Sequence, residues 1–261
     1  MAAVTRGISC PGCPHRAAYI ACKEALGRGR GHVMCGNAGC AAVGYMHPAA
    51  TTCPGGEEAL LPRYRQDVPA GGSPEEPASE RCVHVALDTE IAAADAPDRF
   101  GGLAQEGRST VLAVLASNRD FLAQDAIEDL GRRALALGAE DAAVVDPFDL
   151  LSAQDIVSSM LERPGLHAVV FASPCARLVH GEQAPEPAEI DQYACVGCHR
   201  CKQITGCPAL TFTPPFYHID SATCAGCDLC VNFCRTHVIY TPRDRMTPEQ
   251  RGAQRYAAAR R

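Results

Sequence analysis

Cysteine is the residue type most able to do chemistry in this sequence, since it accounts for 16 of the 261 residues. Eight of the cysteines form two related segments near the C-terminus, CVGCHRCKQITGCP and CAGCDLCVNFCR. Such triplets with a trailing fourth cysteine are typical of proteins with two [4Fe–4S] clusters, where the fourth cysteine ligates the other cluster. This rule assigns Cys195, Cys198, Cys201 and Cys234 to one cluster, and Cys207, Cys224, Cys227 and Cys230 to the second.

Two features of these segments depart from the common pattern. Five residues separate Cys201 from Cys207, which should only enlarge a loop, and Arg235 stands where proline often follows the last cysteine. A guanidinium there would raise the reduction potential of a nearby cluster. Structural zinc is the alternative occupant, but zinc usually takes four ligands as two separated pairs, which leaves ligands in both segments unexplained.

A third set of cysteines lies near the N-terminus, where Cys10 and Cys13 occur in SCPGCPHR and are followed by Cys35, Cys40 and Cys53. Residues 16–26 predict a helix that ends at Gly27, so the first pair lies at a helix start, where the dipole favours thiolate. A thioredoxin-like dithiol also begins a helix, but that fold needs a preceding strand, and only nine residues precede Cys10. Packing is the expected role of Cys22, Cys82 and Cys175.

The composition gives no reason to expect nucleic acid or a membrane as partner. The net charge is −6, no apolar run approaches the ~20 residues that span a bilayer, and the N-terminus lacks the order of a signal peptide. The sequence therefore predicts a cytoplasmic protein. Thiols stay reduced in that compartment, which favours metal binding over disulfides.

The middle of the chain alternates between strand and helix patterns. Apolar runs at 83–87, 111–115, 142–145 and 169–172 predict buried parallel strands. Residues 122–137 predict an amphipathic helix, and Ser152 is expected to cap another through Glu162, with Asp155 completing a capping box. This order is typical of an α/β layer with a parallel sheet.

Composition shifts divide the chain into four parts. We expect an α/β domain over 1–180 with a loop excursion at 54–80, a linker over 181–190, a small α+β ferredoxin domain with two [4Fe–4S] clusters over 191–241, and a basic helical tail over 242–261. Thr247, Pro248 and Gln250 form a helix-start signature in that tail. Its arginines are expected to be solvated, with docking onto an acidic partner as the alternative.

Several motifs resemble one family in order along nearly the whole chain. CPGCPHR resembles the start of the thiamine-diphosphate domain of the indolepyruvate:ferredoxin oxidoreductase α-subunit family, and GNAGC, TTC, VVDPFDL and PCARLV resemble its later segments. The double-cluster module closes both sequences, whereas the family's pyrimidine-binding domain has no counterpart here. The resemblance implies a thiamine-diphosphate-binding-like fold, and a family that forms a carbanion from a 2-oxoacid and sends its electrons through iron–sulfur clusters to ferredoxin.

The resemblance also implies site residues. Cys10, Cys13, Cys40 and Cys53, with Cys35 as a substitute, would hold a third cluster, with zinc or unoccupied thiols as alternatives. Asp88 and Asn118 would bind Mg²⁺ and thiamine diphosphate, although both residue types are also common loop formers. His15 and Arg16 would contact a cofactor or an acidic substrate, or would simply bond the neighbouring loop.

The thiamine site departs from the family pattern in ways that argue against its function in this chain alone. Leu87 replaces a glycine before Asp88, and glutamates at 57, 58, 75 and 76 would line the diphosphate unfavourably. We therefore expect an electron-transfer subunit that works with a catalytic or redox partner subunit and a ferredoxin-like carrier. The alternatives are an active thiamine-dependent subunit completed by a partner chain, and a zinc scaffold.

Overall fold

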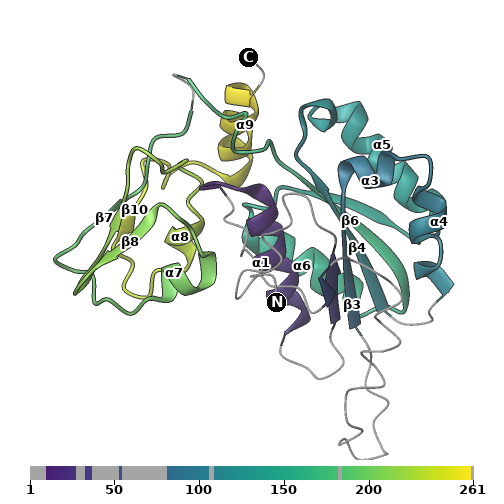
Figure 1. Ribbon diagram of the computed structural model, residues 1–261, viewed down its shortest axis with the longest axis horizontal. Coiled ribbons are helices and arrows are strands. Elements are labelled where there is room, and N and C mark those ends of the chain that lie inside the picture. Colours follow the sequence, from purple (N-terminus) through teal and green to yellow (C-terminus); the bar gives the residue numbers. More distant parts are fainter. Residues whose placement is uncertain are drawn as a thin grey trace, which may run out of the picture.

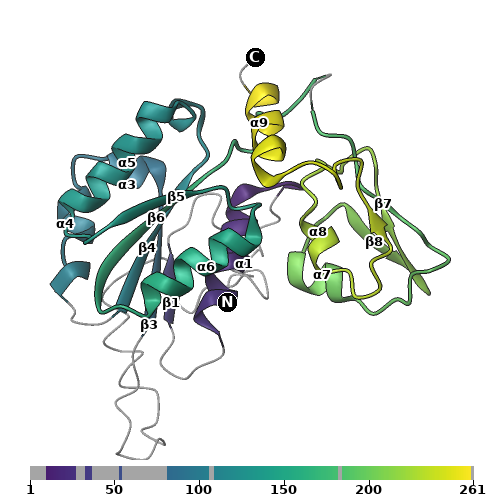
Figure 2. The same cartoon turned by 180° about the vertical axis from the view of Figure 1, so that it is seen from behind.

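A computed structural model describes residues 10–27, 33–36, 53–54, 81–105, 109–181 and 184–259, the two short strands at 33–36 and 53–54 by their backbone alone. An α/β body and a cysteine-rich module over residues 184–241 lie side by side, and the last helix lies between them (Figure 1). The opposite view shows the same arrangement (Figure 2). The predicted loop excursion lies outside the described residues, apart from its first residue. The predicted division into domains stays a prediction.

A parallel sheet forms the centre of the α/β body. Its described strands are β1 (Val33–Gly36), β2 (Cys53–Pro54), β3 (Arg81–Leu87), β4 (Ser109–Ala116), β5 (Ala142–Val145) and β6 (Gly165–Ala172). They are paired in the order β2-β1-β3-β4-β6-β5, and every pairing is parallel. The prediction of an α/β layer with a parallel sheet is therefore confirmed, although β1 and β2 were not among the predicted strands.

Helices cover both faces of this sheet. On one side lie α1 (Pro14–Leu26) and α6 (Leu150–Leu161), and on the other lie α3 (Asp88–Ala92), α4 (Ala96–Phe100) and α5 (Gln124–Ala136), with short 3₁₀ turns at Leu103–Gln105 and Arg119–Phe121 (Figure 1). Residues of β4 alternate between the two cores: Val111 and Leu115 pack with α1 and α6, whereas Leu112 and Val114 pack with α5. Each face thus buries its own apolar core.

The start of α6 differs from the sequence prediction. The helix begins at Leu150, and the Asp149 carboxylate accepts the N–H of Ser152 at 3.5 Å. Asp149 is therefore the cap in place of Ser152, and the expected capping box with Asp155 is wrong. The reason is local: an aspartate three residues ahead of Ser152 allows another half-turn of helix, which buries Leu150 against the core.

The cysteine-rich module consists of short elements. They are β7 (Glu189–Ile190), α7 (Arg200–Thr205), β8 (Leu210–Thr213), β9 (Phe216–Ile219), α8 (Leu229–Asn232) and β10 (Ile239–Tyr240). β8 and β9 form an antiparallel hairpin, and β7 pairs with β10 from the other end of the module. The expected linker over 181–190 thus ends in a strand that closes the module.

The final helix, α9 (Pro248–Ala259), begins with the predicted cap, because the Thr247 hydroxyl accepts the Gln250 N–H and the Gln250 amide accepts the Thr247 N–H. The expectation of a solvated basic tail is wrong for Arg255, which is 6% exposed, pairs with Asp146 and lies 4.6 Å from the ring centre of Phe148. Among the described residues, no helix has both the length and the apolar character to cross a bilayer.

Candidate functional site

The two C-terminal cysteine segments adopt the same backbone conformation. Gly197 and Gly226, the residues before the second cysteine of each triplet, have φ angles of +60° and +59°. His199 and Asp228, the residues after that cysteine, have φ angles of +61° and +62° and cap α7 and α8. Left-handed backbone at non-glycine positions is uncommon. Its repetition at matched positions shows that the two segments share the same local fold.

The first cysteine group consists of Cys195, Cys198, Cys201 and Cys234. Burial, with smaller contributions from nearby thiolates at the other three positions, raises the pKa of Cys201 to about 11. Cys195 and Cys234 also pack against the small core around Cys201. The fold therefore brings together four cysteines that are up to 39 positions apart in the sequence (from 195 to 234).

The second cysteine group consists of Cys207, Cys224, Cys227 and Cys230, and all four residues line one narrow cavity. Burial raises the pKa of Cys227 to about 12, and burial with the neighbouring thiolates also raises the pKa of Cys230. Cys201 of the first group is among those neighbours. The two groups are thus adjacent, and each contains the fourth cysteine contributed by the other segment.

Within the parts of the chain that the structure describes, no three His, Cys, Asp or Glu side chains converge with the geometry of metal ligation. The chemistry of the donors still restricts what they could hold. Four cysteines supply soft thiolate ligands, which suit iron–sulfur clusters and zinc. Because burial disfavours the thiolate form, a positively charged metal centre would be needed to deprotonate them.

The N-terminal turn, residues 10–13, lies against the second cysteine group. Gly12 has a φ angle of +70°, and a Cβ atom placed on it would stand 2.6 Å from the Cβ of Ala225. Cys13 lines the same cavity as Cys227, whereas Cys10 is exposed. Only glycine allows this close approach, which places the CxxC motif beside a segment of the module that lies 213 positions later in the sequence (from 12 to 225).

Cys175 is a candidate that the sequence analysis assigned to packing. It follows β6 and is partly exposed. Burial raises the pKa of the Cys13 thiol to about 11, and Cys175 lies near enough that its thiolate is a smaller cause of this rise. One sequence signal could have identified Cys175. It follows a predicted parallel strand, and the CxxC motif at the helix start is expected at the same edge of the sheet.

The remaining members of the predicted third set are only partly described. Cys53 lies in β2, and its Cα is paired in register with that of Cys35 in β1, so these two positions are neighbours across parallel strands. Cys40 lies outside the described residues. The structure therefore brings Cys10 near Cys13, and Cys35 near Cys53, without testing the set as a whole.

The predicted pair Asp88 and Asn118 does meet at the carboxyl ends of β3 and β4. Asp88 is fully buried, and its carboxylate accepts four hydrogen bonds from the chain. One oxygen accepts from the Thr89 N–H at 2.7 Å and the Asn118 side-chain amide at 2.5 Å. The other accepts from the backbone N–H groups of Ser117 and Asn118, at 2.9 Å and 3.0 Å. This uses the acceptor capacity of a carboxylate.

His15 and Arg16 make internal contacts at the start of α1. The Nε2 atom of His15 lies 2.7 Å from the Ser117 hydroxyl, and burial lowers the pKa of His15 to about 4, so the ring is neutral at pH 7. Arg16 donates to the carbonyl oxygens of Cys10 and Thr205. These contacts favour the simpler alternative, in which both side chains bond neighbouring backbone and loops.

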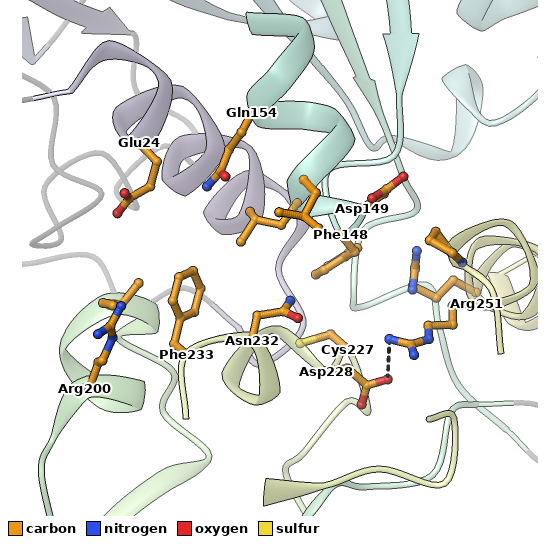
Figure 3. A pocket seen from close by; sticks show the side chains of 15 residues that line it. Glu24, Phe148, Asp149, Gln154, Arg200, Cys227, Asp228, Asn232, Phe233 and Arg251 are labelled. Atoms are coloured by element: carbon orange, nitrogen blue, oxygen red, sulfur yellow. Dashed lines mark ion pairs between the residues drawn. The ribbon is translucent and has the colours of Figure 1, made fainter. Parts of the chain in front are cut away.

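A cavity of about 520 Å³ lies where the α/β body, the module and α9 meet (Figure 3). Its wall carries Phe148 and Gln154 from the body, Asn232 and Phe233 from the module, and Arg251 from α9. Cys227 lines both this cavity and the narrow cavity of the second cysteine group. The larger cavity thus opens toward one side of that group.

The fold and the cysteine groups define the class: an α/β protein whose parallel sheet is joined to a module built around cysteines. No protein-family model matches the chain.

Comparison with individual proteins shows which ones the chain is similar to. The indolepyruvate oxidoreductase subunit IorA of Methanothermobacter marburgensis is 25% identical over 248 residues, which cover 86% of this chain and 38% of that protein. IorA of Methanothermobacter thermautotrophicus is 26% identical over 93% of this chain and 40% of its own length, and IorA of Thermococcus kodakarensis is 31% identical over 115 residues. The predicted resemblance to the IorA family is confirmed, and the chain spans at most about two-fifths of these relatives.

Proposed function

We propose that the chain is an electron-transfer subunit of an oxidoreductase complex related to the 2-oxoacid:ferredoxin oxidoreductases. The residues around 191–241 form a ferredoxin domain that holds two [4Fe–4S] clusters. The observation that carries this proposal is the grouping of eight cysteines into two sets of four, each with a trailing cysteine from the other segment. Structural zinc sites do not require that each group of four takes its fourth cysteine from the other segment.

The placement of the two groups supports an order of electron transfer. The second group faces the N-terminal turn of the α/β body, because Cys13 and Gly12 line its cavity. The first group includes Cys198, which is exposed, and is flanked by Tyr193 and Val196, which are 98% and 64% exposed. Electrons from a catalytic partner would reach the second cluster through the body side and leave from the first cluster to a ferredoxin-like carrier.

Thiamine diphosphate with Mg²⁺ does not fit the residues at the sheet edge. A Mg²⁺ ion requires free carboxylate and carbonyl oxygens in near-octahedral geometry. Both Asp88 oxygens are already held by the chain, and the Asn118 amide is itself one of the donors. We therefore propose no thiamine chemistry on this chain, and the active-subunit alternative loses its main support.

The N-terminal turn would hold a third metal centre only with additional cysteine ligands from other parts of the α/β body. Cys10, Cys13 and Cys175 are the described cysteines at that edge. We propose them, with one cysteine from the 35–53 region, as the ligands of that centre. This replaces the packing role that the sequence suggested for Cys175.

Single cysteine substitutions test the assignment of the two clusters. Cys230→Ser should lower the iron content by one cluster and remove one of the reduced-cluster signals in electron paramagnetic resonance. The matched control is Cys22→Ser, since Cys22 is a buried cysteine of α1 and belongs to neither group. Equal iron in both variants and the unchanged protein would exclude Cys230 as a ligand.

A further inference from the structure

The cavity where the α/β body, the module and α9 meet has the size of a small-molecule site. Its volume is about 520 Å³, within the range of about 300–1,000 Å³ that is usual for ligand and cofactor sites. Such sites occur preferentially between structural units, and residues of α1, α6, α7, α8 and α9 form the wall of this one (Figure 3). The proposed electron path does not use this cavity.

Two aromatic rings lie on the wall, one from each side of the interface. Phe148 follows β5 in the body, and Phe233 follows α8 in the module. Both side chains are partly buried and pack against the core between α1, α6 and the sheet, so neighbouring residues fix their positions. Aromatic faces bind planar ring systems by stacking. The cavity therefore suits a planar aromatic ligand.

Two carboxamide side chains on the same wall are available to such a ligand. Gln154 belongs to α6 and Asn232 is the last residue of α8, and neither side chain forms a hydrogen bond with another residue that the structure describes. Each carboxamide has two N–H donors and an acceptor oxygen. A heterocycle whose edge carries both carbonyl and N–H groups matches this combination.

The charged side chains of the wall favour a negative group at the α9 end. The Arg251 guanidinium lies 3.8 Å from the Asp228 carboxylate, whose two oxygens already accept hydrogen bonds from Arg243 at 2.9 Å and 2.7 Å. Donors of Arg251 therefore remain for a ligand, and arginine is well suited to phosphate. Of the other carboxylates on the wall, Glu24 lies at the opposite end and Asp149 caps α6 (Figure 3).

The cavity also adjoins the second cysteine group, because Cys227 lines both this cavity and the narrow one around that group. Under the proposed function, Cys227 is a ligand of the second [4Fe–4S] cluster. A molecule in the larger cavity would then contact a ligand of that cluster. Among phosphorylated heterocycles with carbonyl and N–H groups at their edge, flavins are the class that exchanges single electrons.

We infer that this cavity binds a flavin nucleotide. Its ring system lies at Phe148 and Phe233, and its phosphate lies at Arg251. The choice of a flavin rests on the proposed electron-transfer function. Oxidised flavin would take two electrons, one at a time, from the reduced second cluster and two protons from solvent, and the cluster would return to its oxidised form after each transfer. The cavity would thus provide a second exit for electrons, besides the route through the first cluster.

The test is a titration of flavin mononucleotide with the anaerobically purified full chain, followed by the fluorescence of the flavin. We expect saturable binding of one flavin per chain. Phe233→Leu keeps an apolar side chain but removes the ring, so it should weaken the affinity by about tenfold. Absence of binding by a chain with its full iron content would overturn the inference and leave the proposed function intact.

Arg251→Gln tests the position of the phosphate. This variant should bind flavin mononucleotide about tenfold more weakly, whereas its affinity for riboflavin, which lacks the phosphate, should be that of the unchanged protein. Arg245→Gln is the matched control and should leave both affinities unchanged, because Arg245 is exposed and does not line the cavity. Equal affinity for flavin mononucleotide in the unchanged protein, Phe233→Leu and Arg251→Gln would overturn the inference.

Iron per chain, determined on the same samples, shows whether each variant keeps the module folded. If Phe233→Leu loses iron, Gln154→Leu takes its place, since Gln154 lies in the body, and it should weaken flavin binding several-fold. Tighter binding of adenosine monophosphate than of flavin mononucleotide would overturn the assignment to flavins. A chain that binds flavin but contains no iron would instead defeat the proposed function and keep the binding site.

Discussion

The α/β body and the cysteine-rich module are stabilised in different ways. The body has two apolar cores, one on each face of the sheet, with large side chains such as Tyr19, Phe171 and Leu112 fully buried. The main core cluster of the module is small, and cysteines make up much of its surroundings; it consists of Ala188, Cys201, Leu210, Tyr217 and Ile239. The body can fold on apolar burial, whereas a module this small usually needs a metal centre or disulfides.

The two regions therefore differ in whether the residues that stabilise the fold also carry the proposed chemistry. Under the proposed function, the thiols that carry electrons are also the residues that complete the core of the module. Loss of the clusters should then unfold the module. The body should respond to substitutions in its apolar core and be indifferent to the metal.

Removal of iron should have the largest effect. We expect an iron chelator under reducing conditions to abolish hydrogen-exchange protection over residues 186–241, because metal binding and folding are linked in such modules. The amides of β3, β4 and β6 should stay protected under the same conditions. Equal protection of the module before and after iron removal would contradict the difference between the two regions.

A core substitution in the body should give the reverse pattern. Phe171→Ala removes a side chain that is 2% exposed in β6 and should destabilise the body by ~3–5 kcal/mol. The iron content per folded chain should stay unchanged. Leu151→Ala, at a position that is 75% exposed, serves as the control and should change the unfolding free energy by less than ~0.5 kcal/mol.

The buried ion pair in the module should give a comparable loss there. Arg243 donates to both carboxylate oxygens of Asp228, at 2.9 Å and 2.7 Å, and both side chains are 4% exposed. Arg243→Met removes both hydrogen bonds and leaves the buried carboxylate with the longer contact to Arg251, at 3.8 Å, so it should cost ~3 kcal/mol. Adding Asp228→Asn should recover part of this loss, since asparagine tolerates the left-handed backbone at that position. The free energies of unfolding are measured by chemical denaturation. If the loss in the double variant equalled the sum of the losses in the two single variants, the two side chains would not be coupled.

The Asp88 network should give the smallest of these effects. Asp88→Asn replaces one carboxylate oxygen by an amide NH₂ group, which cannot accept the hydrogen bonds that this oxygen received. The free energy of unfolding of the body should therefore fall by ~1–3 kcal/mol. Thiamine diphosphate with Mg²⁺ should leave the melting temperature of the unchanged protein where it was, because a ligand of the native state would raise it. A rise that disappears in Asp88→Asn would restore the thiamine site.

The sequence predicted the parts of the structure that follow local rules. The strands β3, β4, β5 and β6 and the helices α1, α5 and α9 were predicted because apolar runs and capping residues specify them. The pairing of β1 with β2 and β3 could not be predicted, since β1 and β2 are short and β1 lies 17 and 45 positions before its two partners (from 36 to 53 and from 36 to 81). The grouping of the C-terminal cysteines was predicted from spacing alone.

What spacing could not reveal depends on tertiary contacts. The closeness of Cys175 to Cys13, the span of Arg16 from Cys10 to Thr205, and the burial of Arg255 against Asp146 join residues more than 100 positions apart. The hydrogen bonds of Asp88 were also hidden, because the residue types do not show that four N–H groups of the chain donate to its carboxylate. Residue types show which polar and ligating groups are present, whereas only the fold shows which partners these groups have.

The measurement that tests the central claim most directly is the iron and acid-labile sulfide content per chain after anaerobic purification, with zinc determined on the same sample. The two cysteine groups predict about eight iron atoms and eight sulfides per chain, and a third centre at the N-terminal turn would bring the iron to about twelve. Zinc without iron would contradict the account.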